Sequence, residues 1–270
     1  MMSMEPFDIG RFLIVPGRKF HCILIKVKFK LGVLEKLASL ASKFGVRVSY
    51  VSYSMQRDYG KSVKAVVFLD VTDITIPVER LIEEAKKLEF VEEIREFKPE
   101  IESLALDSFS FPLTIGDSRV IILREEGIRG IINGLRERLG SAAETIQYYV
   151  GFEAGLEFGR SHKKLGEALG IKSPSDIFSK ISAPLFVSVG FGVMKVLKIS
   201  ENPPYAYLRI HRCFECECCP KRSDEPYSHL VRGMIAGAFT SILGVEMFAK
   251  EIKCIAKGDP YCEFEITPKK

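Results

Sequence analysis

The chain has 270 residues, which is enough for one large domain or two of modest size. Hydrophobic residues make up 47% and charged residues 27%, the balance of an ordinary globular protein. The formal net charge of +4 is small and the charges are scattered, so a nucleic-acid-binding surface is excluded as an expectation.

The N-terminal residues MMSMEPFDIGRFLIVPGRK contain an early acidic residue and no apolar run before a small-residue cleavage site, unlike a signal peptide. The longest apolar stretch, residues 181–194, is shorter than the ~20 residues that a membrane helix needs, and it contains Pro184. We therefore expect a cytoplasmic protein without a membrane segment, in which thiols stay reduced. The seven cysteines then favour metal or redox chemistry over disulfides.

The first domain is expected within residues 1–98, where alternating and helical apolar patterns follow one another. Strands are predicted at residues 19–28, 46–55, 62–71 and 91–97, helices at 33–44 and 77–88, and a hairpin turn at 58–60. This βαββαβ order predicts an α+β, ferredoxin-like unit in which both helices lie on one face of an antiparallel sheet.

The first domain resembles an ACT domain, a small regulatory module that commonly senses amino acids. The resemblance rests on Leu31-Gly32-Val33-Leu34 at the start of the first helix and on Phe44-Gly45-Val46 before the second strand. The family usually places its effector near the loop before the first helix, which implies a ligand-binding role for Gly32. Phe29-Lys30 replaces the polar residue often found just upstream. A structural or dimerising module is therefore the alternative, with exposed sheet edges and an uncovered sheet face that would pair two subunits.

Residues 99–118 are expected to form a linker that leads into a short strand, and residues 119–270 a second domain. Helices are predicted at residues 125–139, 141–165, from 174 onward and at 227–243, and strands at 119–123, 190–199, 205–212, 246–255 and 261–266. Packed helices and an antiparallel sheet without a regular βαβ repeat are again typical of the α+β class.

Two of the predicted helices carry glycines four residues apart, and such residues share one helix face. Each glycine inside a helix costs about 1 kcal/mol relative to alanine, so the pattern requires a geometric reason. One reason is close packing of two helices, and the other is a small-molecule cavity bordered by aromatic side chains; both can hold at once. The candidate ligand-binding residues are Tyr149, Phe152, Gly155, Gly159, Gly233 and Gly237.

The cysteines gather in two places. Four lie in the stretch HRCFECECCP, residues 211–220, and Cys254 and Cys262 lie symmetrically about Gly258 in the last predicted hairpin. Across that turn their Cβ atoms would be about 5 Å apart, close enough for two thiolates to share Zn²⁺, which takes four ligands. A redox dithiol such as Cys216 with Cys219 and inert buried thiols are the alternatives. The spacing does not match common iron–sulfur motifs.

Residues 110–267 resemble a 4-vinyl reductase domain, most specifically in the closing hairpin Cys254-Ile-Ala-Lys-Gly-Asp-Pro-Tyr-Cys262-Glu-Phe264. The family is a small-molecule-binding domain of bacteriochlorophyll-biosynthesis proteins and phenol-sensing activators. In the phenol sensors, three Cys and one Glu hold zinc near the ligand pocket. The resemblance implies zinc ligation by Glu251, Cys254 and Cys262 and places the third thiol at Ser228.

Because this chain has serine at position 228, a cysteine from the upstream stretch has to supply the missing thiol. The candidates are Cys216, Cys218 and Cys219. A second requirement concerns Glu251 and Cys254, whose side chains point to opposite faces of an ideal strand. Both can bind one ion only if the strand is bulged or strongly twisted.

The sequence shows no Ser/His/Asp array, P-loop or dinucleotide-binding glycine motif after a strand. We therefore expect a homodimeric regulator or sensor that binds a small hydrophobic ligand in the C-terminal domain, beside a cysteine-rich zinc site. A reductase or carrier subunit acting on a tetrapyrrole or other hydrophobic substrate is one alternative, and a protein-interaction scaffold is the other. An enzymatic role is thus not expected but stays open, and the residues do not identify the ligand.

Overall fold

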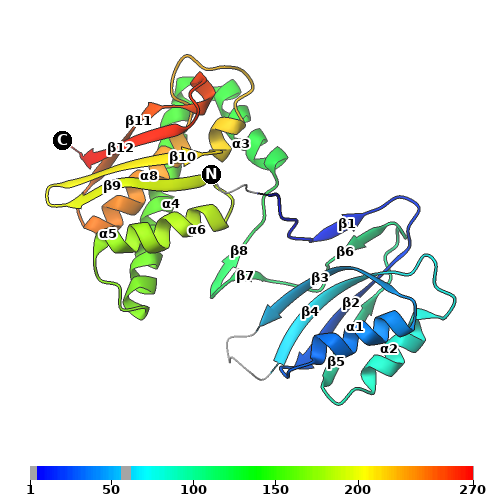
Figure 1. Ribbon diagram of the computed structural model, residues 1–270. Coiled ribbons are helices and arrows are strands. Elements are labelled where there is room, and N and C mark those ends of the chain that lie inside the picture. The colour runs from blue at the N-terminus through cyan, green and yellow to red at the C-terminus, as the bar shows by residue number, and fades with distance from the viewer. Residues whose placement is uncertain (1–4, 56–61, 270) are drawn as a thin grey trace. The chain divides into compact units, whose positions relative to one another are not determined.

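The computed structural model describes residues 5–55 and 62–269 and divides the chain into two compact units, residues 1–121 and 122–270 (Figure 1). The hairpin turn predicted at residues 58–60 lies outside the described residues. The first unit includes residues 99–118, the segment expected to be a linker.

The first unit is built on a four-stranded antiparallel sheet with the strand order β3-β4-β2-β5. Its elements are β2 (Phe20–Lys28), α1 (Val33–Lys43), β3 (Arg47–Met55), β4 (Ser62–Asp70), α2 (Val78–Lys86) and β5 (Val91–Phe97). Both helices bury their apolar residues against the same face of the sheet, through Ile23 and Ile25 of β2. The predicted βαββαβ order and the α+β class are therefore confirmed.

The opposite face of this sheet is covered by a short antiparallel pair, β1 (Phe12–Ile14) and β6 (Leu104–Leu106). Ala105 of β6 is fully buried and packs in one cluster with Cys22 and Phe68 of the sheet. The expectation of an uncovered sheet face is therefore wrong. Strands of three residues are too short for an alternating pattern, which is why the sequence did not indicate them.

The end of the first unit forms a hairpin of β7 (Leu113–Ile115) and β8 (Ser118–Val120). Gly116 occupies the turn with a φ of 55°, a left-handed conformation that glycine adopts without steric cost.

The second unit contains a four-stranded antiparallel sheet in the order β11-β12-β10-β9, packed against helices (Figure 1). The strands are β9 (Val193–Glu201), β10 (Pro204–His211), β11 (Met247–Lys253) and β12 (Cys262–Pro268). The helices are α3 (Glu125–Leu139), α4 (Ser141–Ala168), α5 (Pro174–Ile177), α6 (Ala183–Ser188), α7 (Phe214–Glu217) and α8 (His229–Leu243). A π-helical turn (Phe178–Ser182) joins α5 to α6, and this unit is again α+β.

Helix α8 is the centre of this unit and is apolar on nearly all sides. It contacts α4 along one face, and Val231, Ile235 and Phe239 join the core that the sheet residues form on the other. None of the helices in the described part of the chain combines the length and the apolar character that crossing a bilayer requires.

Candidate metal centre

Four buried side chains bring their donor atoms together where α7 meets the hairpin of β11 and β12. The donors of Cys216, Glu251, Cys254 and Cys262 all lie within 4.8 Å of one another. Cys216 Sγ is 3.4 Å from Cys262 Sγ, 3.6 Å from Cys254 Sγ and 4.0 Å from Glu251 Oε1. Zn–S bonds of about 2.3 Å place the thiolates of a tetrahedral site about 3.8 Å apart. The donor set therefore fits a single tetrahedral ion.

A β-bulge lets Glu251 and Cys254 face the same side. Glu251 pairs with Phe264, and Lys253 pairs with the next residue of β12, Glu263, so that Ile252 is an extra residue in β11. The Ile252 side chain is exposed, while Glu251 and Cys254 are buried on either side of it. The strand thus meets the geometric requirement that the sequence raised for a shared ion.

The turn between Cys254 and Cys262 is held by Asp259. Its carboxylate accepts a hydrogen bond from the Cys254 amide at 2.8 Å, and its own amide donates to the Cys254 carbonyl at 3.1 Å. Gly258 makes this turn with a φ of 99°, where a side chain would be strained. The Gly-Asp pair between the two cysteines therefore fixes the backbone that carries Cys254.

Backbone amides point at the donors of the site. Tyr227 N donates to Cys254 Sγ at 3.4 Å, Ile255 N to Cys262 Sγ at 3.4 Å, and Ser228 N to Glu251 Oε2 at 3.2 Å. Such donors stabilise the deprotonated forms that bind metals. Without a metal, burial and the neighbouring Cys254 raise the pKa of Glu251 to about 8. Hydrogen bonds from Cys216 and Cys262 lower the pKa of Cys254, which therefore carries the negative charge of the cluster.

Of the three upstream candidates, the structure brings only Cys216 to the group. Cys218 is buried outside the group. Cys219 is half-buried, and its Sγ donates to the Lys221 carbonyl at 2.7 Å. Ser228 is buried next to Glu251, and within the described part of the chain its hydroxyl finds no hydrogen-bond partner.

Cys213 is the residue that the sequence reasoning missed. It is fully buried, and its thiol hydrogen bonds to those of Cys216 and Cys262. It is nevertheless outside the group whose donor atoms all lie within 4.8 Å of one another. The signal that could have found it is the spacing Cys213-x-x-Cys216, because a CxxC pair brings two thiols together at the start of a helix.

The glycines of α4 and α8 allow the two helices to touch. A Cβ atom on Gly151 or Gly155 would lie 2.1 or 2.2 Å from a carbonyl oxygen of α8, and one on Gly233 or Gly237 would lie 2.0 Å from a carbonyl oxygen of α4. A Cβ on Gly159 would come within 2.6 Å of Ser241. Close packing therefore accounts for these residues, and their role in ligand binding stays a prediction.

The other predicted ligand-binding residues lie in different surroundings. Phe152 packs against the core, whereas the Tyr149 side chain is 56% exposed. In the first unit, Gly32 caps α1 in a left-handed conformation and faces open space, with no atom within 4 Å of the position of a Cβ.

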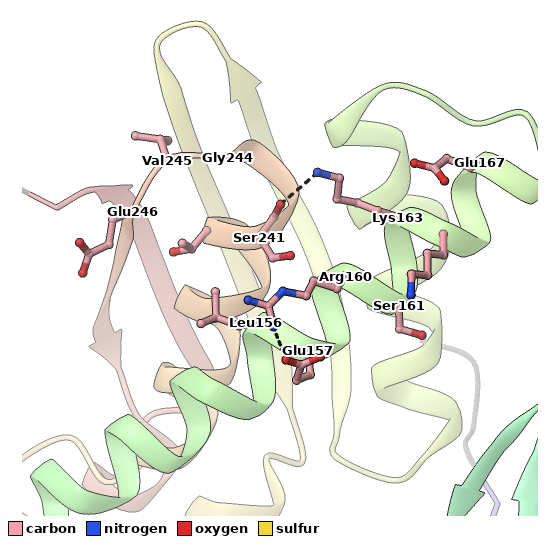
Figure 2. Close-up of a pocket in the computed structure, with 12 residues that line it drawn as sticks. Leu156, Glu157, Arg160, Ser161, Lys163, Glu167, Ser241, Gly244, Val245 and Glu246 are labelled. Atoms are coloured by element: carbon pink, nitrogen blue, oxygen red, sulfur yellow. Dashed lines mark hydrogen bonds and ion pairs between the residues drawn. The ribbon is translucent and has the colours of Figure 1, made fainter.

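A hollow of about 730 Å³ lies beside the C-terminal half of α4 and the end of α8 (Figure 2). Its lining includes Glu157, Arg160, Lys163 and Glu246, and Lys163 Nζ donates to the Ser241 carbonyl at 3.4 Å. A charged, open lining differs from the apolar walls that a small hydrophobic ligand prefers. This hollow is therefore not the pocket that the sequence led us to expect.

Comparison with known proteins matches the segment that carries the four donors to a described family. Residues 206–268 match the family model of the 4-vinyl reductase domain. The uncharacterized protein MJ0745 of Methanocaldococcus jannaschii is 36% identical over 70 residues, which are 26% of this chain and 37% of that protein. MJ0150 of the same organism is 30% identical over 127 residues, 47% of this chain and 66% of that protein. The matched segments thus span less than two thirds of either relative.

Among solved structures, the phenol-responsive sensory domain of the transcription activator PoxR, determined with phenol, is similar in fold. The TM-score is 0.53 at 18% sequence identity, over 57% of this chain and 79% of that chain. At this identity the similarity concerns the fold alone. The chain therefore contains a 4-vinyl reductase domain at residues 206–268. The extension of that domain to residue 110 and the ACT assignment of the first unit stay predictions.

Proposed function

We propose that the second unit is a metal-stabilised sensor domain that binds a small hydrophobic molecule, and that the chain is a regulator rather than an enzyme. The observation that carries the proposal is the buried set of three thiols and one carboxylate around one point. The 4-vinyl reductase match over the same segment supports it, as does the fold shared with a phenol-responsive sensory domain.

Zinc is the ion that the donor set suits best. Zn²⁺ prefers thiolate ligands in a tetrahedral arrangement, and hard cations such as Mg²⁺ prefer oxygen. Four protein donors leave no open position for water or substrate, which is typical of structural rather than catalytic zinc sites. All four proposed ligands are buried, so zinc would fasten α7 to the β11–β12 hairpin from inside the core.

The glycine contacts restrict where a hydrophobic ligand can bind. Because backbone atoms of α4 and α8 fill the space at Gly155 and Gly237, a ligand near Phe152 has to separate the helices, and one near Tyr149 has to lie on the exposed side of α4. For the first unit we propose an ACT-like regulatory role and self-association of the chain as a homodimer.

Native mass spectrometry of the full chain, purified anaerobically, tests the proposal. We expect one zinc ion per chain, an even number of chains per particle, and loss of the zinc in a Cys254→Ser/Cys262→Ser variant. A co-purified apolar molecule would support the sensor role. A metal-free wild-type protein would contradict the zinc site, and turnover of a substrate with a reductant would contradict the non-enzymatic role.

A further inference from the structure

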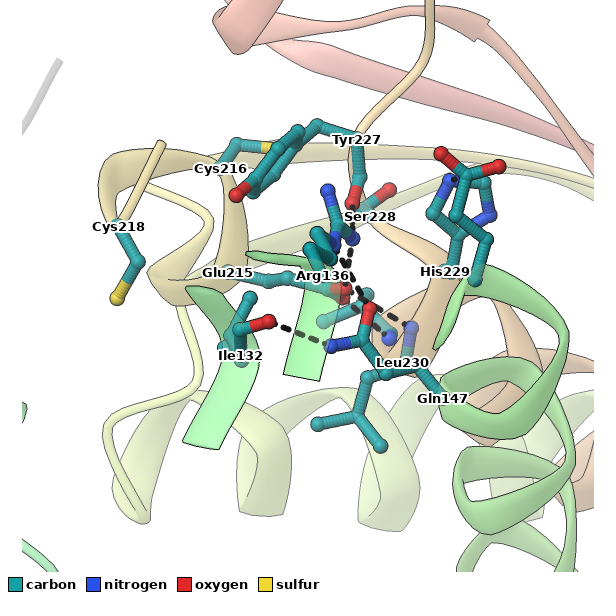
Figure 3. Close-up of polar contacts among 12 residues, drawn as sticks. Ile132, Arg136, Gln147, Glu215, Cys216, Cys218, Tyr227, Ser228, His229 and Leu230 are labelled. Carbon is teal, nitrogen blue, oxygen red and sulfur yellow. Dashed lines mark hydrogen bonds and ion pairs between the residues drawn. The ribbon is translucent and has the colours of Figure 1, made fainter. Parts of the chain in front are cut away.

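Arg136 of α3 is the hub of a buried polar network beside the metal centre (Figure 3). Only 13% of its side chain is exposed. Its guanidinium donates to Gln147 Oε1 at 2.9 Å, to the Tyr227 carbonyl at 2.6 Å and to Glu215 Oε1 at 3.2 Å. It also lies 3.5 Å from the centre of the Tyr227 ring. A planar guanidinium with several donors and a stacked face is well suited to fixing several groups at once.

Two partners of Arg136 adjoin the proposed metal ligands along the chain. Glu215 directly precedes Cys216. Tyr227, whose carbonyl binds Arg136, donates its amide to Cys254 Sγ at 3.4 Å. The position of Arg136 therefore bears on two of the three thiols of the centre. Groups that orient metal ligands from the next layer commonly decide metal affinity.

Glu215 has a second task at the start of α8. Its carboxylate accepts hydrogen bonds from the amides of Leu230 at 3.0 Å and Val231 at 2.8 Å, in the first turn of that helix. Ser228, the residue before the helix, provides no side-chain cap. A carboxylate at a helix N-terminus satisfies free amides and interacts favourably with the helix dipole. Glu215 thus binds the cysteine-bearing segment to α8, and Arg136 is its counter-charge.

Helix α3 depends on this network for its attachment. Ile132 is the buried residue that the helix contributes to the interior. The next residue, Asn133, donates to the Cys218 carbonyl at 2.9 Å and accepts from the Tyr227 hydroxyl at 2.7 Å. With so little apolar area buried, polar contacts with the cysteine-rich segment hold α3 in place.

We propose that Arg136 and Glu215 are positioning residues that hold Cys216 and Cys254 in the metal-binding arrangement and thereby make the order of helix α3 depend on the metal. The inference rests on the proposed metal centre and adds to it the element that responds to occupancy. Because α3 is the first helix of the second unit, directly after the boundary at residues 121 and 122, it is the element through which the chain leads from the first unit into the centre.

The test is a double-mutant cycle on zinc affinity in the full chain, using Arg136→Met, Glu215→Gln and the double variant, with a chromophoric chelator as competitor. Removing Arg136 alone leaves a buried carboxylate unpaired, which destabilises the fold, whereas the double variant has no unpaired charge. We expect each single change to weaken zinc binding about 10- to 100-fold, as for other outer ligand partners. The double variant should lose no more than the weaker single variant, because the two residues act as a unit.

Two further readouts separate positioning from general stability. The absorption spectrum of the Co²⁺-substituted protein should change in the variants and return towards that of the wild type in Arg136→Lys. Hydrogen exchange of α3 amides should slow when zinc is added to the wild type but not to the double variant. Arg129→Met is the matched control, since Arg129 lies on the same helix and pairs with Glu125 at the surface.

Unchanged zinc affinity and an unchanged Co²⁺ spectrum in folded variants, with only a lower melting temperature, would overturn the positioning role. α3 exchange that is independent of zinc in the wild type would overturn the coupling. A wild-type protein that binds no metal would refute the proposed centre itself, and this outcome is distinguishable because it appears before any variant is made.

Discussion

At the scale of single residues, the metal centre differs from the family pattern in the origin of one thiol. The resemblance places that thiol at position 228, where this chain has a buried serine whose amide donates to Glu251. Cys216 fills the place from the other direction, from the short helix α7. The two positions thus face the same site, which makes an exchange between them feasible.

We predict that Cys216→Ser abolishes stoichiometric zinc binding and that Cys216→Ser/Ser228→Cys restores it, because either position can present a thiolate to the ion. Zinc released by a thiol-reactive reagent and quantified with a dye measures both. Cys218→Ser and Cys219→Ser are the controls and should keep their zinc, since neither thiol lies in the group. Retention of zinc by the Cys216→Ser single variant would contradict the ligand assignment.

The raised pKa of Glu251, about 8 without metal, makes a prediction for pH dependence. In the unfolded chain this carboxyl ionises near 4.5, so between pH 4.5 and about 8 the folded metal-free state holds one proton more than the unfolded state. The free energy of unfolding of the chelator-treated protein should therefore fall as the pH rises through this window. Glu251→Gln should remove that contribution.

Zinc should reverse the sign of this dependence. The zinc-loaded native state holds its three thiols deprotonated, whereas unfolded thiols stay protonated up to about pH 8.5. The free energy of unfolding of the zinc-loaded protein should then rise with pH up to that value. Urea denaturation at pH 5.5, 6.5 and 7.5 measures both slopes, and slopes of the same sign in the two states would refute ligation by Glu251 and the thiols.

The sequence predicted the residues of this site unevenly, for a physical reason. Cys254, Cys262 and Glu251 lie in a hairpin whose Gly-Asp turn sets their spacing, so a motif could point to them. Cys213 and Cys216 lie beside a helix of four residues in an irregular segment, where no periodicity tells which thiol faces inward. The network around Arg136 was invisible, because it joins residues up to 91 positions apart.

At the scale of elements, the glycine-mediated contact of α4 and α8 supports the core that surrounds the centre. We predict that Gly155→Ala lowers the free energy of unfolding by about 1–3 kcal/mol, the usual cost of overpacking, because its Cβ would meet the Met234 carbonyl at 2.2 Å. Gly134→Ala in α3 is the control: no atom lies within 4 Å of its Cβ, so helix propensity should stabilise it by up to about 1 kcal/mol. Urea denaturation measures both, and equal effects would contradict the close contact.

Long periodic elements were predictable and short ones were not. The strand β5 and the helix α3 match the residues expected from their apolar patterns, and α4 runs only a few residues beyond its predicted end. The strands β1, β6 and β7, with three residues each, escaped, and so did the covering of one sheet face. Their positions are decided by tertiary packing, which leaves no local signal in three residues.

At the scale of the whole molecule, self-association is the untested part of the account, and β3 offers a surface for it. This edge strand exposes Val51 and Tyr53, while the other edge, β5, carries charged residues. Apolar edge strands favour pairing between chains. We predict that Val51→Lys converts the dimer to a monomer in sedimentation equilibrium, whereas Glu93→Lys on β5 does not. The reverse pattern would assign the interface to β5, and a monomeric wild type would refute the dimer.

The central claim is a single buried ion held by three sulfurs and one oxygen, and X-ray absorption spectroscopy at the zinc edge tests it most directly. The account predicts three sulfur neighbours at about 2.3 Å and one oxygen at about 2.0–2.2 Å. In Glu251→Gln the oxygen contribution should weaken or be lost, and in Cys213→Ser the spectrum should stay that of the wild type. Four sulfur neighbours in the wild type would contradict the account by making Cys213 a ligand, and a shell of nitrogen and oxygen alone would refute the thiolate centre.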